Sequence, residues 1–227
     1  MAPFPFLTTA CVALISGGVA VAGAPAAWRV PRRGPGVDQG RPSVYPPGRP
    51  NVGALIVIFL AGLVGAGAVT ARVGWRSALA GLLVAVVGGI WLAVVDLRVR
   101  RLPAVAVLMI TAAAGVLLGL AACVDGEKAR LLAVVAGAVG MRLAYRVNQA
   151  VVGGMGAGDL RMAYLLGGVG GWAGWPGWMA AAVLPFALSA LAGGLLLVLG
   201  HRRRNEPVPF GPAIVIGMIA ALLVADQ

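Results

Sequence analysis

The stretch SALAGLLVAVVGGIWLAVVDL, residues 77–97, decides the fold of this chain. Its 21 residues are apolar except for Ser77 at the start and Asp96 near the end. About 20 apolar residues in a helix are enough to cross the roughly 30 Å hydrocarbon core of a bilayer. The stretch therefore predicts a transmembrane helix that holds one carboxylate close to its end.

Similar apolar runs fill the rest of the chain, and we expect eight transmembrane helices in all. The predicted spans are residues 6–27, 52–71, 77–97, 103–124, 131–152, 160–175, 178–200 and 212–225. Of the 227 residues, 60% are apolar and 11% are charged, whereas soluble domains have about 45–50% and about 25%. The expected fold class is an all-α, polytopic integral membrane helical bundle. This composition excludes a soluble enzyme or a DNA-binding domain.

The chain divides into two parts at residue 51. Residues 1–51 hold the first span and a short loop rich in proline, glycine and arginine, and residues 52–227 hold the remaining spans. The first span could be a cleaved signal peptide. However, no positive charge precedes it, and it exceeds the usual apolar length of about 7–15 residues. We therefore expect a retained helix.

The net charge of +11 comes mostly from arginines that lie in short clusters between the apolar runs. The main clusters lie in residues 28–51, 98–101 and 202–204. Short loops rich in Lys and Arg face the cytoplasm, and a topology with both termini outside places all three clusters there. Arg72 and Arg76 are exceptions, because this topology puts them outside. The expected partner is the lipid bilayer and not a nucleic acid.

Only two of the seven acidic residues lie at predicted helices. Asp96 stands near the end of the third span, and Asp159 opens the sixth. Alone, Asp96 could pair with a nearby arginine, and Asp159 could cap its helix. A carboxylate in or beside a bilayer is costly enough to suggest a function. The topology brings both residues to the cytoplasmic end of their helices, so we expect them to share a site.

Two carboxyl groups at a site shielded from water do not both ionise easily, so one keeps a proton near neutral pH. Such a pair meets the requirement of aspartic proteolysis. One carboxylate takes a proton from water, and the other, protonated, polarises the peptide carbonyl. Groups for other chemistry are scarce, because the only histidine is His201, and Cys11 and Cys123 are far apart. No metal and no cofactor are expected.

Four glycines precede Asp159, and they are Gly153, Gly154, Gly156 and Gly158. Glycine allows a positive φ and a close approach of other segments. We expect these residues to break the chain between two helices and to set Asp159 against a neighbour. A substrate backbone could also lie there.

With both aspartates placed, the chain resembles the type IV prepilin peptidases, membrane aspartic proteases of the GxGD group. Three stretches carry the resemblance: DLRVRRLP at residues 96–103, GMGAGDLRM at 154–162 and PFGP at 209–212. The first is similar to the family's first-aspartate motif and the second to its second-aspartate motif. The third is similar to its Pro-Phe-Gly-Pro segment. Together the similarity covers roughly residues 77–227.

The resemblance implies an endopeptidase that removes the short basic leader of prepilins or pseudopilins. It implies that the protein acts at the cytoplasmic face of the bacterial cell membrane, with Asp96 and Asp159 as the catalytic pair. Residues 52–227 then form a membrane-embedded peptidase domain. The residues expected to bind substrate or to shape the site are Gly154, Gly156, Gly158, Arg161 and Pro103.

One departure from the family concerns the segment between the first two spans. Bifunctional members have an insert there whose two cysteine pairs bind zinc, and they also N-methylate the new terminus with S-adenosylmethionine. Residues 28–51 of this chain are short and contain no cysteine. We therefore expect neither zinc nor methyltransferase activity, unless methylation uses other residues.

Three other functions stay open from the sequence. The chain could be another GxGD protease with a different substrate, a carrier that uses the two aspartates as a proton relay, or a non-catalytic subunit of a pilus or secretion machine. A carrier site lies near mid-bilayer, whereas both acids are expected near one surface, which favours the protease. Arg142 and Arg146 share one helix face. They could approach the aspartates or meet a substrate carboxylate, but snorkelling to the interface is favoured.

Overall fold

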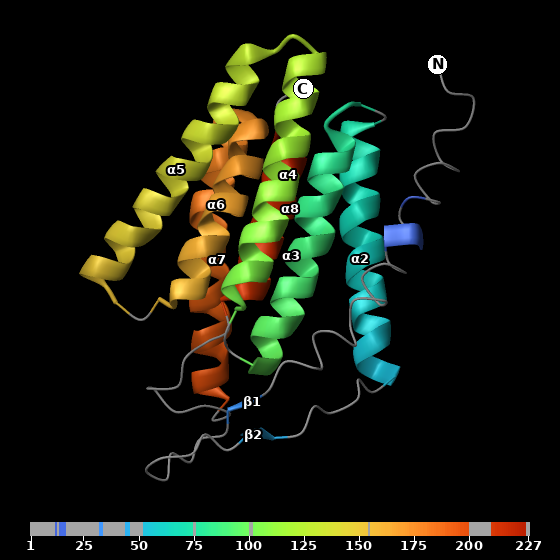
Figure 1. The fold of residues 1–227 in the computed structure, drawn as a ribbon. Helices are drawn as coiled ribbons and strands as arrows, with labels where there is room; N and C mark the ends of the chain where they lie inside the picture. The colour runs from blue at the N-terminus through green and yellow to red at the C-terminus, as the bar shows by residue number, and fades with distance from the viewer. Residues whose placement is uncertain are drawn as a thin grey trace.

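The computed structural model describes residues 12, 14–16, 32–33, 44–45, 52–74, 76–99, 102–153, 155–199 and 210–225. These residues are mainly helical (Figure 1). The helices are α2 Val52–Val73, α3 Leu79–Val99, α4 Ala104–Val124, α5 Lys128–Val151, α6 Ala157–Trp172, α7 Gly174–Val198 and α8 Gly211–Val224. A short antiparallel pair joins β1 Arg32–Arg33 to β2 Val44–Tyr45.

The first predicted span is described only at residues 12 and 14–16, which are helical. The rest of that span lies outside the described residues. So does most of the loop predicted for residues 28–51, together with Gly154 and the arginine cluster 202–204.

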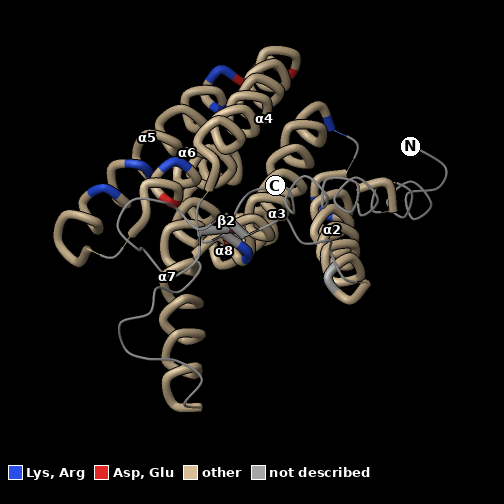
Figure 2. The backbone as a smooth tube through the Cα atoms, turned by 60° about the horizontal axis from the view of Figure 1, so that its bottom comes forward, with Lys and Arg blue, Asp and Glu red and all other residues tan. Residues whose placement is uncertain are grey.

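The protein is a multi-pass membrane helical bundle. Five helices, α2, α3, α4, α5 and α7, are long and apolar enough to cross a membrane. Figure 2 shows long stretches of helix without charge, and α7 and α8 carry no charged residue within their described bounds. Helices α6 and α8, with 16 and 14 residues, are shorter than the roughly 20 that a span needs. Both bury much of their surface against the longer helices.

The structure corrects the boundaries around the sixth span. Helix α6 begins at Ala157 and ends at Trp172, and α7 begins at Gly174. The predicted break after residue 175 is thus a few residues too late. The reason is Gly174, whose φ of 81° lies in the left-handed region that glycine tolerates and that a continuous helix cannot contain. At its other end, α6 begins at Ala157, before the predicted start at residue 160. Asp159 therefore lies inside the first turn of α6.

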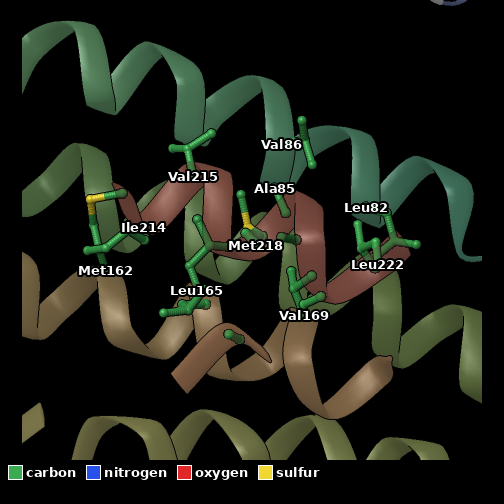
Figure 3. Packing of buried hydrophobic residues seen from close by; sticks show 14 of the residues in the cluster. Leu82, Ala85, Val86, Met162, Leu165, Val169, Ile214, Val215, Met218 and Leu222 are labelled. Atoms are coloured by element: carbon green, nitrogen blue, oxygen red, sulfur yellow. The ribbon is translucent and has the colours of Figure 1, made fainter. Parts of the chain in front are cut away.

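Helix α8 lies between α3 and α6 and forms the centre of the core (Figure 3). Met218 in the middle of α8 is fully buried, and it packs among apolar side chains of both neighbours. Around it lie Leu82, Ala85 and Val86 from α3, and Met162, Leu165 and Val169 from α6. This packing holds α8 between α3 and α6.

Helices α5 and α6 approach each other through glycine. A Cβ at Gly137 would lie 2.5 Å from the carbonyl oxygen of Gly167, and a Cβ at Gly171 would overlap the carbonyl oxygen of Ala133. Small residues four apart let helix backbones come together in lipid, where dispersion and weak polar contacts hold helices. Gly167 and Gly171 are four apart on α6, and Ala133 and Gly137 are four apart on α5. The position of α6, and with it that of Asp159, depends on this interface.

Arg72, which the predicted topology places outside, has a partner at the end of α8. Its guanidinium donates a hydrogen bond to the carbonyl oxygen of Ala225 at 2.6 Å. Ala225 is the C-cap of α8, where helix carbonyls lack intrahelical donors and a cation is favourable. Arg72 therefore ties the end of α2 to the end of α8.

One end of the bundle gathers the helix termini that matter for the site. The end of α3, the start of α4, the end of α5 and the starts of α6 and α8 all lie there (Figure 1). We call it the aspartate end, because Asp96 near the end of α3 and Asp159 at the start of α6 both belong to it. The turn between α4 and α5 lies at the opposite end.

Candidate active site

Asp96 is a buried carboxylate held by a helix start. It lies in the last turn of α3, which ends at Val99, and only 6% of the residue is exposed. The backbone N–H of Gly211 donates a hydrogen bond to its Oδ2 at 2.8 Å. Gly211 is the first residue of α8, and the N–H groups of a first helical turn have no intrahelical acceptor. The Asp96 carboxylate therefore occupies the anion-binding end of α8.

Asp159 is held in a similar way by its own helix. It is the third residue of α6, and its Oδ2 accepts a hydrogen bond from the backbone N–H of Gly156 at 3.0 Å. An acidic side chain at this position commonly reaches back to the N-cap. Asp159 is therefore not the N-cap residue considered from the sequence, because that position is Gly156, but its side chain caps the N-cap N–H from the third helical position. This hydrogen bond also fixes the orientation of the carboxyl group.

The glycine-rich segment before Asp159 makes the turn between α5 and α6. Gly153 has a φ of 76°, a left-handed conformation that other residues rarely adopt. The side-chain amide of Gln149 donates a hydrogen bond to the carbonyl oxygen of Met155 at 2.9 Å. This bond ties the segment to the last turns of α5. Gln149 was not singled out from the sequence, because only the fold brings its amide to the turn.

The two aspartates line one cavity at the aspartate end. Its volume is about 390 Å³, and its lining residues are Asp96, Leu102, Gly156, Ala157, Gly158, Asp159 and Arg161. The two carboxyl groups are close enough to interact electrostatically. The tertiary structure thus brings together two acids that are 63 positions apart in the chain.

Gly158 lets the segment before α4 pack against α6. A Cβ on Gly158 would lie 2.8 Å from the Cβ of Leu102. Leu102 is buried, and the next residue, Pro103, is the N-cap of α4. Pro103 itself does not line the cavity, whereas Gly156, Gly158 and Arg161 do. Gly154 is the one predicted site residue that lies outside the described residues.

Gly211 is a site residue that the sequence did not single out. A Cβ added to it would lie 2.9 Å from Oδ2 and 3.0 Å from Cβ of Asp96, so the position has no room for a side chain. The available signal was its place in the stretch PFGP at residues 209–212, where glycine alone suggests only a turn. Its contact with Asp96 spans 115 positions of the chain.

An aromatic cluster supports the start of α8. The rings of Tyr145 and Phe186 have centroids 5.0 Å apart, those of Tyr145 and Phe210 are 6.1 Å apart, and those of Phe186 and Phe210 are 5.3 Å apart. Tilted and edge-to-face contacts of this kind are favourable beyond the area that they bury. Phe210 is the N-cap of α8 and directly precedes Gly211. The cluster therefore links α5 and α7 to the residue that binds Asp96.

The two arginines of α5 lie in different surroundings. Arg146 is exposed, as a snorkelling side chain would be. Arg142 is half-buried, with its guanidinium carbon 5.5 Å from the centroid of the Tyr164 ring on α6, a cation–π contact. Neither residue lines the cavity of the aspartates.

The cavity offers acid–base chemistry. It presents two carboxyl groups, one guanidinium and glycine backbone, and each carboxylate has one oxygen bound by an N–H at a helix start. Among the described residues, no group of three or more His, Cys, Asp or Glu side chains could hold a metal ion. Two adjoining carboxyl groups can exchange a proton with a water molecule and with a carbonyl oxygen placed between them.

Comparisons of the chain with models of protein families, with curated proteins and with solved structures gave no match.

Proposed function

We propose that the protein is a membrane-embedded aspartic endopeptidase that removes the leader peptide of type IV prepilins or pseudopilins. The observation that carries the proposal is the cavity that Asp96 and Asp159 share at one end of a membrane helical bundle. The stretches similar to those of the prepilin peptidases supply the substrate class. Two of them meet at this cavity, and the third supplies Gly211, which binds Asp96.

The proposed reaction uses one proton held between the two carboxyl groups. The ionised carboxylate takes a proton from water as the water oxygen attacks the peptide carbonyl carbon. The protonated carboxyl gives its proton to the carbonyl oxygen, which forms a tetrahedral diol. When the diol collapses, the C–N bond breaks and the leaving nitrogen receives the proton that the first carboxyl group took from water. The second carboxylate takes a proton from a diol hydroxyl group, which leaves a carboxylic acid product and restores the single shared proton. The helix-start N–H groups of Gly156 and Gly211 hold the two carboxyl groups in place throughout.

The location of the cavity suits a substrate that is itself a membrane helix. A prepilin has an apolar helix directly after its polar leader, so the bond to be cut lies where the helix enters the membrane. Both aspartates lie close to the helix ends that bound the bundle. With the arginine-rich loops inside, the aspartate end faces the cytoplasm of a bacterial cell, where the leader would reside.

The direct test is co-expression of the protein with a prepilin in cells that lack their own prepilin peptidase. Mass spectrometry of the pilin N-terminus should show the trimmed form. A new terminus without a methyl group is expected, because the zinc-binding insert of the bifunctional members has no counterpart here. If intact precursor persists while the protein is present at normal levels in the membrane, prepilin cleavage is refuted. Cleavage of another single-span substrate in the same assay would instead support a different GxGD protease.

Gly211→Ala is expected to reduce cleavage about tenfold or more while the protein stays folded. The new methyl group would lie 2.9 Å from Oδ2 of Asp96, so the carboxylate must move. Small displacements of catalytic groups can cost up to about 10² in rate. Initial cleavage rates of the purified variant in detergent, with its thermal stability, would measure the effect.

The matched control is Gly194→Ala in α7, where nothing lies within 4 Å of the added Cβ. It makes the same chemical change in a helix and should leave the rate unaltered. Equal rates for Gly211→Ala and Gly194→Ala would show that the contact of Gly211 with Asp96 is unimportant for the reaction.

A further inference from the structure

Tyr145 carries a hydroxyl group whose burial needs an explanation. The residue is 0% exposed, and within the described part of the chain its Oη has no hydrogen-bond partner. Burying a hydroxyl group without a partner costs stability, and buried polar groups in native proteins are rarely left so. A phenylalanine would bury the same ring without this cost. The hydroxyl group is therefore the part of Tyr145 that packing does not explain.

The ring of Tyr145 packs against two other rings, and one of them adjoins the residue that binds Asp96. It packs against Phe186 with an interplanar angle of 58° and against Phe210 with an angle of 71°. Phe210 directly precedes Gly211, which donates to Asp96. One turn after Tyr145 on the same helix, Gln149 holds the segment that leads to Asp159.

Tyr145 is also close enough to Asp159 to interact with it electrostatically. A phenol is neutral near pH 7 and has one proton to donate. A carboxylate is the strongest neutral-pH acceptor that a protein offers such a donor. The nearby Asp159 is therefore the acceptor that best suits the Tyr145 hydroxyl group.

We propose that Tyr145 is a positioning residue, whose hydroxyl group hydrogen-bonds to the Asp159 carboxyl group, directly or through one water molecule, when a substrate peptide occupies the cavity. The bond holds the oxygen of Asp159 that faces the substrate, while Gly156 holds Oδ2. The proton of the phenol stays on Tyr145 throughout. This inference rests on the proposed function, because it assigns a role in the same reaction.

The test is Tyr145→Phe, compared with Tyr164→Phe as a matched loss of a tyrosine hydroxyl group. Tyr164 lies on α6 under Arg142, and its ring keeps the cation–π contact as phenylalanine. Steady-state cleavage of a prepilin by purified protein gives kcat and KM, and thermal unfolding gives stability. A hydrogen bond to a charged group is worth about 10-fold to 100-fold in rate if it is needed in the transition state.

Tyr145→Phe should lower kcat by about 10-fold to 100-fold, leave KM within about twofold and leave the melting temperature unchanged or higher. Tyr164→Phe should leave kcat at the wild-type value. If Tyr145→Phe also has wild-type kcat while Asp96→Asn is inactive, the role of Tyr145 is refuted and the peptidase stands. A fall in kcat that is matched by a fall in melting temperature would make Tyr145 purely structural and refute the inference too. If the wild-type protein cleaves no prepilin, both proposals fall together.

Discussion

Asp96→Asn and Asp159→Asn are each expected to reduce leader cleavage about 10³-fold or more, which leaves only precursor in a co-expression experiment. General acid–base groups commonly contribute about 10²–10⁴ in rate. Each of the two carboxyl groups acts as acid in one step and base in another, so neither can compensate for loss of the other. An amide side chain neither takes up nor releases a proton near neutral pH.

Both variants should fold normally, because asparagine keeps an oxygen that can accept a hydrogen bond. The N–H of Gly211 would retain an acceptor at position 96, and the N–H of Gly156 would retain one at position 159. The amount of protein in the membrane should therefore match that of the wild type, and the loss of cleavage would be a loss of chemistry.

The matched control is Asp125→Asn, at the opposite end of the bundle. Asp125 lies in the turn between α4 and α5, where its Oδ2 accepts a hydrogen bond from the Ser77 hydroxyl group. This variant should cleave like the wild type. The double variant Asp96→Asn/Asp159→Asn should be no slower than either single variant, because groups that act as a unit have non-additive effects. Trimmed pilin within tenfold of the wild-type rate from either single variant would rule out the catalytic pair.

Gly171→Leu is expected to have the largest effect on folding. A Cβ at this position would overlap the carbonyl oxygen of Ala133 and lie 2.8 Å from its carbonyl carbon. Backbone cannot move aside as a side chain can, so α5 and α6 must separate. We expect a destabilisation of about 3 kcal/mol or more, at the upper end of overpacking effects. The yield of monodisperse protein after detergent extraction, and its melting temperature, should both fall.

Gly115→Leu is the control for this change, because nothing lies within 4 Å of a Cβ at Gly115 in α4. Both variants add the same apolar side chain to a helix, and only Gly171 faces another backbone. Any Gly171→Leu protein that does fold should cleave slowly, since Asp159 lies on the displaced helix. A Gly171→Leu protein as stable as Gly115→Leu would show that α5 and α6 do not require this close approach.

The helices and their membrane character could be predicted from the sequence. A run of about 20 apolar residues is long enough to cross a bilayer, and within lipid a helix satisfies its own backbone hydrogen bonds. The length of α6 was harder to predict. Trp172, Trp175 and the residues between them are all compatible with a continuing helix, and the break depends on the left-handed φ of Gly174. Local propensity does not determine such a conformation, since glycine adopts positive and negative φ about equally readily.

The sequence also limited the candidate acids to two, because every other acid lies in a segment between apolar runs or at the chain end. It did not indicate Tyr145, Gln149 or Gly211, whose side chains or backbone are ordinary within their own helices and turns. In the sequence Tyr145 does not differ from the other residues on the apolar face of α5. That its hydroxyl group has no partner among the described residues becomes apparent only when the rings of Phe186 and Phe210 are placed around it.

The amino-acid sequence by itself determined that this chain forms apolar helices in a bilayer and carries carboxylates at two helix ends. The reason is that the burial of apolar side chains and the cost of burying a charge act on each segment separately. Only the tertiary structure decided that Asp96 is bound by Gly211 and shares a cavity with Asp159. That result required α8 to pack between α3 and α6, and glycines to bring α5 against α6. Such contacts join residues far apart in the chain, and their energy depends on shape complementarity between helices, which no single segment contains.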